Sequence, residues 1–188
     1  MKILILLSNG FEETEIIAPA DILVRGGVQV EICSITGKRE MTGTHNFILL
    51  ADSVLPSVVG EETAELIASK YDGVFLPGGQ PNASNLQQDL RVIELVRAFH
   101  KQDKLVSAIC AAPCVLEKAG LLTDKRATSY PGCVNSDNCR EYTDEKVVRD
   151  GKVVTGKAAG AAIDFGLELL WALDMGEKAI EVKKQIFY

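Results

Sequence analysis

The sequence lacks a long hydrophobic run, an excess of positive charge and any nucleotide-binding signature. Its apolar N-terminal run, residues 3–7, is far shorter than the roughly 20 residues of a membrane-spanning helix. That run is also too short for a secretion signal, and residues 8–13 do not form a cleavage site. The net charge of −6 argues against a nucleic-acid partner or an anionic membrane surface. Neither G-x-G-x-x-G nor a Walker motif occurs, so no nucleotide cofactor is expected.

Histidine is also scarce, and cysteine occurs in an odd number. The two histidines are His45 and His100. Five residues separate Cys133 from Cys139, which does not match zinc-ligand spacing, so no metal site is predicted. Five cysteines without a secretion signal indicate a reduced, cytoplasmic protein.

The composition is that of a globular protein with a large core. At 188 residues, 47% hydrophobic and 24% charged, the chain is expected to form one domain over residues 1–188. Strands are predicted at residues 2–7, 28–34, 47–50, 72–77, 105–109, 126–129, 147–148 and 153–154. Helices are predicted at residues 12–25, 61–69, 91–101, from 113 onward, 159–173 and 175–185. This alternation predicts an α/β fold, with a mainly parallel sheet covered on both faces.

Three loops are expected at one edge of that sheet. They are residues 8–15, residues 78–82 and the turn at Cys110, and each follows a predicted buried strand. In such sheets, ligands bind beyond the carboxyl ends of the strands. The sequence therefore predicts a ligand site where these loops meet.

Cys110 stands between a predicted strand, residues 105–109, and a helix that begins near Pro113. Small neighbours, Ala111 and Ala112, permit a sharp turn, so the pattern resembles a nucleophile elbow. A thiol at a helix N-terminus is expected to have a lowered pKa. The alternative is a buried structural cysteine, because free cysteine is among the most buried residue types.

The other two loops offer a carboxyl group and backbone donors. Glu12 and Glu15 each share a helical stripe with apolar residues, which raises the pKa of a carboxyl, and this pattern does not choose between them. Gly78 and Gly79 either form a plain turn or present a backbone N–H to an anion beside Cys110.

Three sequence motifs are similar to those of a known protein family. They are NGFEETE at residues 9–15, LPGG at 76–79 and AICAAP at 108–113. In this order and spacing they closely resemble the ThiJ/PfpI superfamily, most of all its DJ-one branch, over nearly the whole chain. The resemblance implies a flavodoxin-like three-layer sandwich, a homodimer and a cysteine site without a cofactor.

The resemblance also assigns roles. It implies that Cys110 is a reactive, oxidisable cysteine and that Glu15, rather than Glu12, is the protonated carboxyl beside it. Arg25 matches an arginine at the dimer interface near the site. The positions that match backbone N–H groups of an oxyanion site are Gly78, Gly79 and Ala111.

The chain departs from the family pattern at three positions. Tyr130 stands where many relatives have a histidine near the cysteine, and a phenol is a poor base at neutral pH. His45 stands where relatives often have an arginine that reaches towards the partner's site. The protease-like branch places a histidine directly after the cysteine, where this chain has Ala111, so a peptidase is disfavoured.

Two functions are therefore expected as alternatives. The first is a cofactor-independent glyoxalase or protein deglycase that acts on methylglyoxal-like dicarbonyls or their early adducts. The second is a non-catalytic redox sensor, an oxidative-stress protein or chaperone, that uses oxidation of Cys110. The expected partners are a small aldehyde or dicarbonyl and a second copy of the chain.

Overall fold

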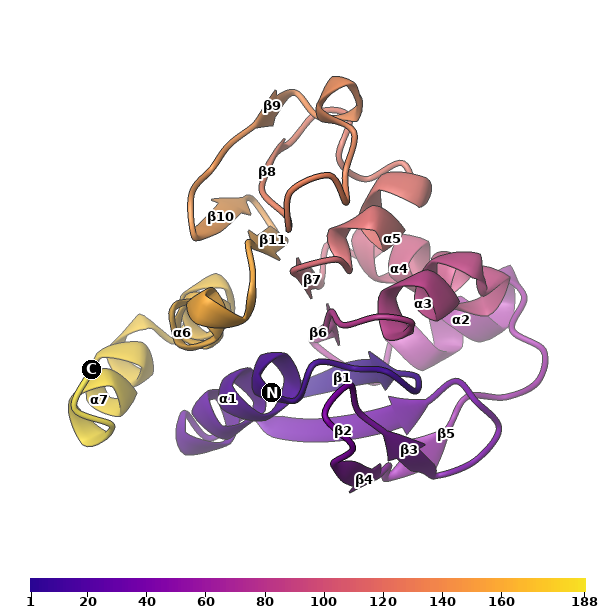
Figure 1. Cartoon of the computed structure of the whole chain (residues 1–188), viewed down its shortest axis with the longest axis horizontal. Coiled ribbons are helices and arrows are strands. Elements are labelled where there is room, and N and C mark those ends of the chain that lie inside the picture. The colour runs from indigo at the N-terminus through magenta and orange to yellow at the C-terminus, as the bar shows by residue number, and fades with distance from the viewer.

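A computed structural model describes residues 1–188, and its centre is a seven-stranded sheet in the order β10-β11-β7-β6-β1-β2-β5 (Figure 1). All neighbouring strands run parallel except β10, which is antiparallel to β11. The strands are β1 (Lys2–Leu7), β2 (Gln29–Ser34), β5 (Ser53–Val54), β6 (Gly73–Leu76), β7 (Leu105–Ile109), β10 (Val147–Asp150) and β11 (Val153–Gly156). The central order β2-β1-β6-β7-β11 is that of flavodoxin-like folds. The predicted α/β fold with a mainly parallel sheet is confirmed.

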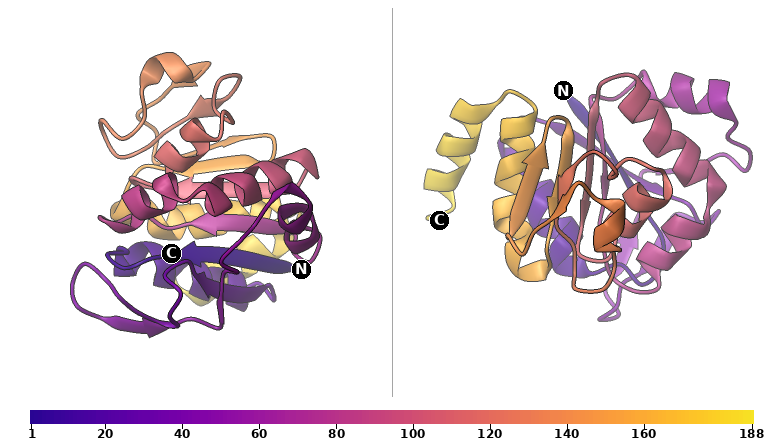
Figure 2. Two further views of the ribbon diagram at one scale, coloured as in Figure 1. Left: turned by 90° about the vertical axis from the view of Figure 1, so that its right-hand side faces the viewer. Right: turned by 90° about the horizontal axis from the view of Figure 1, so that it is seen from above.

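Helices cover both faces of the sheet and make a three-layer sandwich (Figure 2). One face carries α1 (Glu13–Arg25) and α6 (Ala162–Ala172), with α7 (Gly176–Gln185) packed on α6. The other face carries α2 (Glu61–Ala68), α3 (Asn82–Gln88), α4 (Leu90–Lys101) and α5 (Pro113–Lys118). No helix of the chain is both long and apolar enough to cross a membrane.

Strand β1 shows why both faces must be covered. Ile3, Ile5 and Leu7 belong to the core on the α1 and α6 side. Leu4 and Leu6 belong to the core on the side of α2 to α5. Side chains alternate between the faces of a strand, so an uninterrupted apolar run requires helices on both sides.

Several elements differ from the sequence expectation. Strand β8 (Arg126–Ala127) lies outside the main sheet and pairs with β9 (Glu141–Tyr142). The excursion after β2 is a hairpin of β3 (Glu40–Thr42) and β4 (Ile48–Leu50), and α6 is preceded by a 3₁₀ turn (Ala159–Ala161). Helix α3 was not predicted, because its sequence, NASNLQQ, has no apolar periodicity.

The order of the central strands sets the position of the candidate site. Strands β1, β6 and β7 are neighbours and run parallel, so their carboxyl ends meet at one edge of the sheet. The segments that follow them hold Glu15, in the first turn of α1, Gly78 and Cys110. The three loops predicted to lie together are therefore neighbours in the fold.

Candidate functional site at Cys110

Cys110 lies at a strained turn between β7 and α5. Its φ is +64°, in the left-handed region that residues other than glycine seldom adopt. Such a conformation costs on the order of 1–3 kcal/mol and persists only where the surroundings enforce it. Here the Cys110 N–H donates to the Gly156 carbonyl over 2.8 Å, and the Cys110 carbonyl accepts from the Tyr130 N–H over 2.7 Å. These two bonds hold a partly exposed thiol in the geometry of a nucleophile elbow.

Glu15 projects from the first turn of α1 and is 1% exposed. Its Oε2 accepts a hydrogen bond from the Gly78 N–H over 3.1 Å. Its Oε1 is buried and has no hydrogen-bond partner of good geometry. A buried carboxyl oxygen without a donor is costly when the group is ionised, so this environment favours the protonated acid.

Gly78 provides the space in which the carboxyl and the thiol meet. A Cβ at this position would lie 2.5 Å from Glu15 Oε2 and 2.7 Å from the Cys110 Cβ. The Cys110 Cβ is fixed by the elbow, the Ile109 carbonyl oxygen at 2.9 Å is backbone, and the Glu15 carboxyl is buried, so none of them has space to move away easily. Glycine at position 78 is thus required for Glu15 and Cys110 to lie side by side.

The charge state of Glu15 is set mainly by burial. Burial raises the pKa of Glu15 to about 7, with a further upward contribution from the negative charge of Glu12. Hydrogen bonds from the Cys110 side chain and the Gly78 N–H oppose this shift by favouring the carboxylate. Glu15 therefore titrates near neutral pH, which suits a group that both donates and accepts a proton.

The expected low pKa of Cys110 is not supported. Burial raises the pKa of the Cys110 thiol, and the Glu15 carboxylate raises it further by its charge and its hydrogen bond. The N–H groups of Ala111 and Gly79 lower it, as the elbow geometry predicts, but they do not outweigh burial. The helix that follows has only six residues, so its dipole adds little. A protonated Glu15 carries no charge, so the Cys110 thiolate is favoured when Glu15 holds the proton.

The three predicted backbone donors have different partners. The Gly78 N–H is already bonded to Glu15, so its predicted oxyanion role is corrected to that of holding the carboxyl. The N–H groups of Gly79 and Ala111 have no backbone acceptor and are directed at the Cys110 sulfur. Together they form an anion-binding position beside the thiol.

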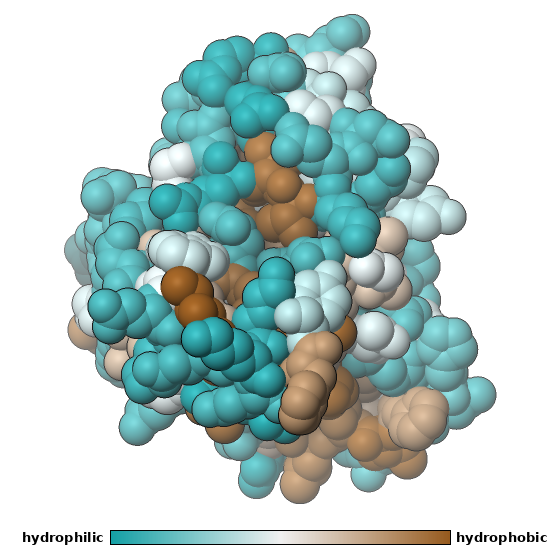
Figure 3. Space-filling view, turned by 90° about the vertical axis from the view of Figure 1, so that its left-hand side faces the viewer, coloured by the Kyte–Doolittle hydropathy of each residue, from teal (hydrophilic) through white to brown (hydrophobic).

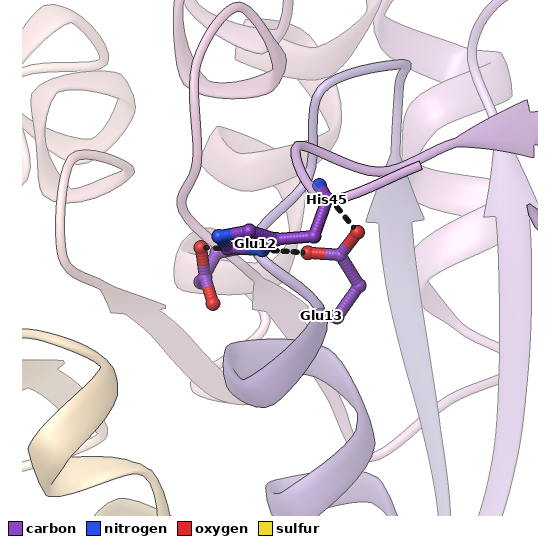
Figure 4. A group of neighbouring side chains, drawn as sticks. All are labelled: Glu12, Glu13 and His45. Atoms are coloured by element: carbon purple, nitrogen blue, oxygen red, sulfur yellow. Dashed lines mark hydrogen bonds and ion pairs between the residues drawn. The ribbon is translucent and has the colours of Figure 1, made fainter. Parts of the chain in front are cut away.

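The three residues predicted to line the site lie in different places. Tyr130 is held at the elbow by its backbone N–H, and the residue as a whole is 52% exposed. Arg25 lies ten residues after Glu15 on α1, about 15 Å further along the helix, and pairs with Asp21 over 2.6 Å. The structure therefore does not bring Arg25 to Cys110 of the same chain. His45 lies on the β3–β4 loop, where its Nδ1 is 2.8 Å from Glu13 Oε2 (Figure 4).

The sequence analysis missed Asn82, which clamps the loops of the site. Asn82 is fully buried, and its Oδ1 accepts from the Ser8 N–H over 2.7 Å. Its amide group donates to the carbonyls of Pro77, over 2.7 Å, and Gly78, over 3.0 Å. These bonds tie the loop after β6 to the loop after β1. No local pattern identifies this asparagine, because Ser8, the partner that links it to the other loop, is 74 residues away in the chain.

Comparison with known proteins identifies the family to which this chain is similar. The model of the DJ-1/PfpI family matches residues 1–172. The chain is 34% identical to protein dj-1beta of Drosophila melanogaster over 96% of its own length and 94% of that protein. It is 29% identical to the Parkinson disease protein 7 homolog of Danio rerio over 97% of its own length and 94% of that protein.

A solved structure agrees with these relatives. The oxidized DJ-1 of Toxoplasma gondii superposes with a TM-score of 0.86 at 26% identity, covering 100% of this chain and 98% of that one. A likeness that spans both chains extends to the whole sandwich, including the edge of the sheet where Cys110 lies. The chain belongs to the DJ-1/PfpI family.

Proposed function

We propose that the protein is a glutathione-independent glyoxalase or deglycase that converts a 2-oxoaldehyde, or its early adducts, to a 2-hydroxy acid. One observation carries this proposal: a buried carboxyl with a pKa of about 7 lies directly beside a thiol on a nucleophile-elbow turn. Proton transfer at a carbon next to a carbonyl needs a group of this kind.

The first step is addition of Cys110 to the aldehyde carbon. As the sulfur–carbon bond forms, the thiol proton passes to Glu15 and the carbonyl electron pair moves to oxygen. The N–H groups of Gly79 and Ala111, which have no backbone acceptor, bind the resulting oxyanion. Glu15 then returns the proton to that oxygen, which gives a hemithioacetal.

The second step moves a proton between two carbons. The Glu15 carboxylate removes the C–H proton of the hemithioacetal, and the electron pair moves through the new C=C bond to the neighbouring carbonyl oxygen, giving an enediolate. The hydroxyl proton on the sulfur-bearing carbon passes to that adjacent oxygen. Glu15 then delivers its proton to the neighbouring carbon as the C=O of the sulfur-bearing carbon forms, which leaves a 2-hydroxy thioester on Cys110. Water cleaves the thioester and releases the acid and the thiol. For methylglyoxal the sum is addition of one water to give lactate: one carbon is oxidised and its neighbour reduced, so no external oxidant is needed.

Tyr130 limits the expected rate. Its exposed hydroxyl is able to donate a hydrogen bond to a substrate oxygen, but a phenol is a poor base at neutral pH. Glu15 then carries every proton transfer alone. We expect slow turnover for this reason.

The test is lactate production from methylglyoxal by the full chain in the absence of glutathione. Cys110→Ala should abolish it, and Glu15→Gln should lose about 10²-fold or more in kcat while still binding substrate. Cys114→Ala is the matched control, because this cysteine is a free thiol one helical turn after Cys110 and the mechanism does not use it. Wild-type rates in either site variant would disprove the mechanism.

A second candidate, a redox sensor, rests on the same two N–H groups. Oxidation of Cys110 by a hydroperoxide to a sulfinate would place negative oxygens where Gly79 and Ala111 bind them. The structure of the Toxoplasma gondii relative is of that protein in an oxidized form. A protein that makes no lactate but converts Cys110 to sulfinate with little excess of peroxide would be a sensor.

We also propose that the protein works in a reducing compartment and that it is a homodimer. A groove of about 640 Å³ runs between α1 and the β3–β4 hairpin, and its lining includes Ile17, Phe47 and Ile48. Phe47 and Ile48 are 66% and 63% exposed, which is unusual for large apolar side chains in one place. In Figure 3, apolar residues gather at the lower right of the face shown. A second copy that covers the groove by a twofold contact would bury these side chains.

A further inference from the structure

A second cluster of polar side chains lies outside the Cys110 pair, at the start of α1. Glu12 is the N-cap of this helix and Glu13 its first residue, while Thr44 and His45 come from the loop between β3 and β4. Figure 4 shows the His45 imidazole between the carboxyl groups of Glu12 and Glu13. Two elements that are 30 residues apart therefore direct four donor groups to one point.

The distances between these groups are short and similar. Thr44 Oγ1 lies 3.2 Å from Glu12 Oε2, 3.1 Å from Glu13 Oε2 and 3.2 Å from His45 Nδ1. His45 Nδ1 lies 2.8 Å from Glu13 Oε2 and 3.7 Å from Glu12 Oε2. These are five of the six edges of a tetrahedron.

Edges of this length match a metal coordination shell. Oxygen and nitrogen ligands about 2.1 Å from a metal lie about 3.0 Å apart at right angles and about 3.4 Å apart in a tetrahedron. The ligand atoms of Glu12, Glu13 and His45 all lie within 4.8 Å of one another. The four donors thus already have the spacing that a bound ion would impose.

Glu12 and Glu13 direct their carboxyl groups to the same two side chains, Thr44 and His45. Glu12 is the N-cap, with an extended backbone, and Glu13 is the first helical residue, and both carboxyl groups contact the same hydroxyl and the same imidazole. The Thr44 hydroxyl has one proton and donates it to only one carboxylate at a time. The Glu12 and Glu13 carboxylates therefore share fewer hydrogen-bond donors than their oxygens are able to accept.

The surroundings hold the cluster in place. The His45 N–H donates to Glu13 Oε1 over 2.8 Å, which leaves Oε2 directed at the centre. The Thr44 N–H donates to the Phe11 carbonyl over 2.9 Å. A Cβ on Gly43 would lie 2.6 Å from the Glu13 Cδ, so glycine there leaves room for this carboxyl. Such outer contacts orient metal ligands.

We propose that Glu12, Glu13 and His45, with Thr44 as a fourth donor, bind a divalent first-row transition-metal ion such as Mn²⁺ or Zn²⁺. The mixture of carboxylate and imidazole favours these ions over Mg²⁺ and Ca²⁺, which take oxygen ligands only. The His45 side chain is 64% exposed, so water completes the shell on the solvent side. No sequence pattern predicts this site, because His45 is far from the two glutamates in the chain and no metal-ligand spacing connects them.

The test is titration of the full chain with Mn²⁺ alone, followed by electron paramagnetic resonance. Manganese binds thiolates poorly, so the five cysteines do not compete. We expect one Mn²⁺ per chain, with affinity reduced at least tenfold in Glu13→Gln and in His45→Gln. Matched controls are Glu62→Gln, in the first turn of α2, and His100→Gln, which should bind as the wild type does.

Circular dichroism checks the fold of each variant, and Thr44→Val provides a milder change of the same shell if a glutamate variant does not fold. Broadening of the amide resonances of residues 43–45 by Mn²⁺ would place the ion at the cluster. Absence of binding at millimolar Mn²⁺ would overturn the proposal and leave the cluster as a closed ion pair. Binding that neither Glu13→Gln, His45→Gln nor Thr44→Val weakens would overturn it as well, since the ion would then lie elsewhere.

Discussion

Gly78 and Glu15 are coupled twice: the Gly78 N–H donates to Glu15 Oε2 over 3.1 Å, and the missing Cβ of Gly78 leaves the space that this oxygen occupies. The same space adjoins the Cys110 Cβ. One glycine therefore fixes the orientation of the carboxyl and its approach to the thiol. Its φ is not in the left-handed region, so the requirement is for space rather than for backbone freedom.

Gly78→Ala should separate Glu15 from Cys110. The added methyl group has no free volume, so the carboxyl or the elbow must move by about 1 Å, which is enough to cost about 10²-fold in rate. The measurement is kcat for lactate production. Gly60→Ala is the control, because a Cβ at position 60 meets no atom within 4 Å. Equal rates in the two variants would mean that the spacing at Gly78 does not matter.

The raised pKa of Glu15 makes stability depend on pH. The folded protein releases the Glu15 proton near pH 7, whereas the unfolded chain releases it near 4.5. Between these values the folded state holds more protons, so the free energy of unfolding falls as pH rises, by about 3 kcal/mol in total. The contribution of Glu15 to the free energy of unfolding is therefore fully present below pH 4.5 and is lost as the pH rises through 7.

Urea unfolding of wild type and Glu15→Gln at several pH values between 5 and 8 measures this effect. The variant has no ionisable group at position 15, so its stability relative to wild type should improve as pH rises. A difference between the two proteins that stays constant across this range would show that Glu15 titrates normally.

The Cys110 elbow could be predicted from sequence because its determinants are local. A buried strand, small residues and Pro113 follow one another within nine positions, and each favours the observed turn. The choice between Glu12 and Glu15 could not be made from the pattern, because both have apolar helical neighbours. The loop after β6 decides it: this loop covers Glu15 completely but leaves Glu12 partly exposed.

Features that depend on distant segments could not be predicted in this way. The low pKa expected for Cys110 followed from the helix alone, and burial together with Glu15 reverses it. Asn82 acts through loops that only the folded sheet brings together. Family resemblance predicts that His45 lies towards a partner's site, and this stays a prediction; within the chain its Nδ1 lies 2.8 Å from Glu13 Oε2, a contact that no local pattern predicts.

Cys110 should be the first of the five thiols to be oxidised by hydrogen peroxide. Every thiol has a pKa raised by burial, so acidity alone does not separate them. The distinguishing feature is the pair of N–H groups from Gly79 and Ala111, which stabilises negative oxygens on sulfur. Peptide mass mapping after brief peroxide treatment should find a sulfinate at Cys110. Prior oxidation of Cys133 or Cys139, which are also partly exposed, would contradict this.

The groove between α1 and β4 should be the contact between two copies of the chain. Ile48→Glu places a charge among apolar side chains that a dimer would desolvate, and an unpaired buried charge is strongly unfavourable. Light scattering at micromolar concentration should give the mass of a dimer for wild type and of a monomer for Ile48→Glu. Val58→Glu is the control, since Val58 is 78% exposed and does not line the groove. A monomeric wild type, or a dimer that tolerates Ile48→Glu, would show that this groove is not the interface.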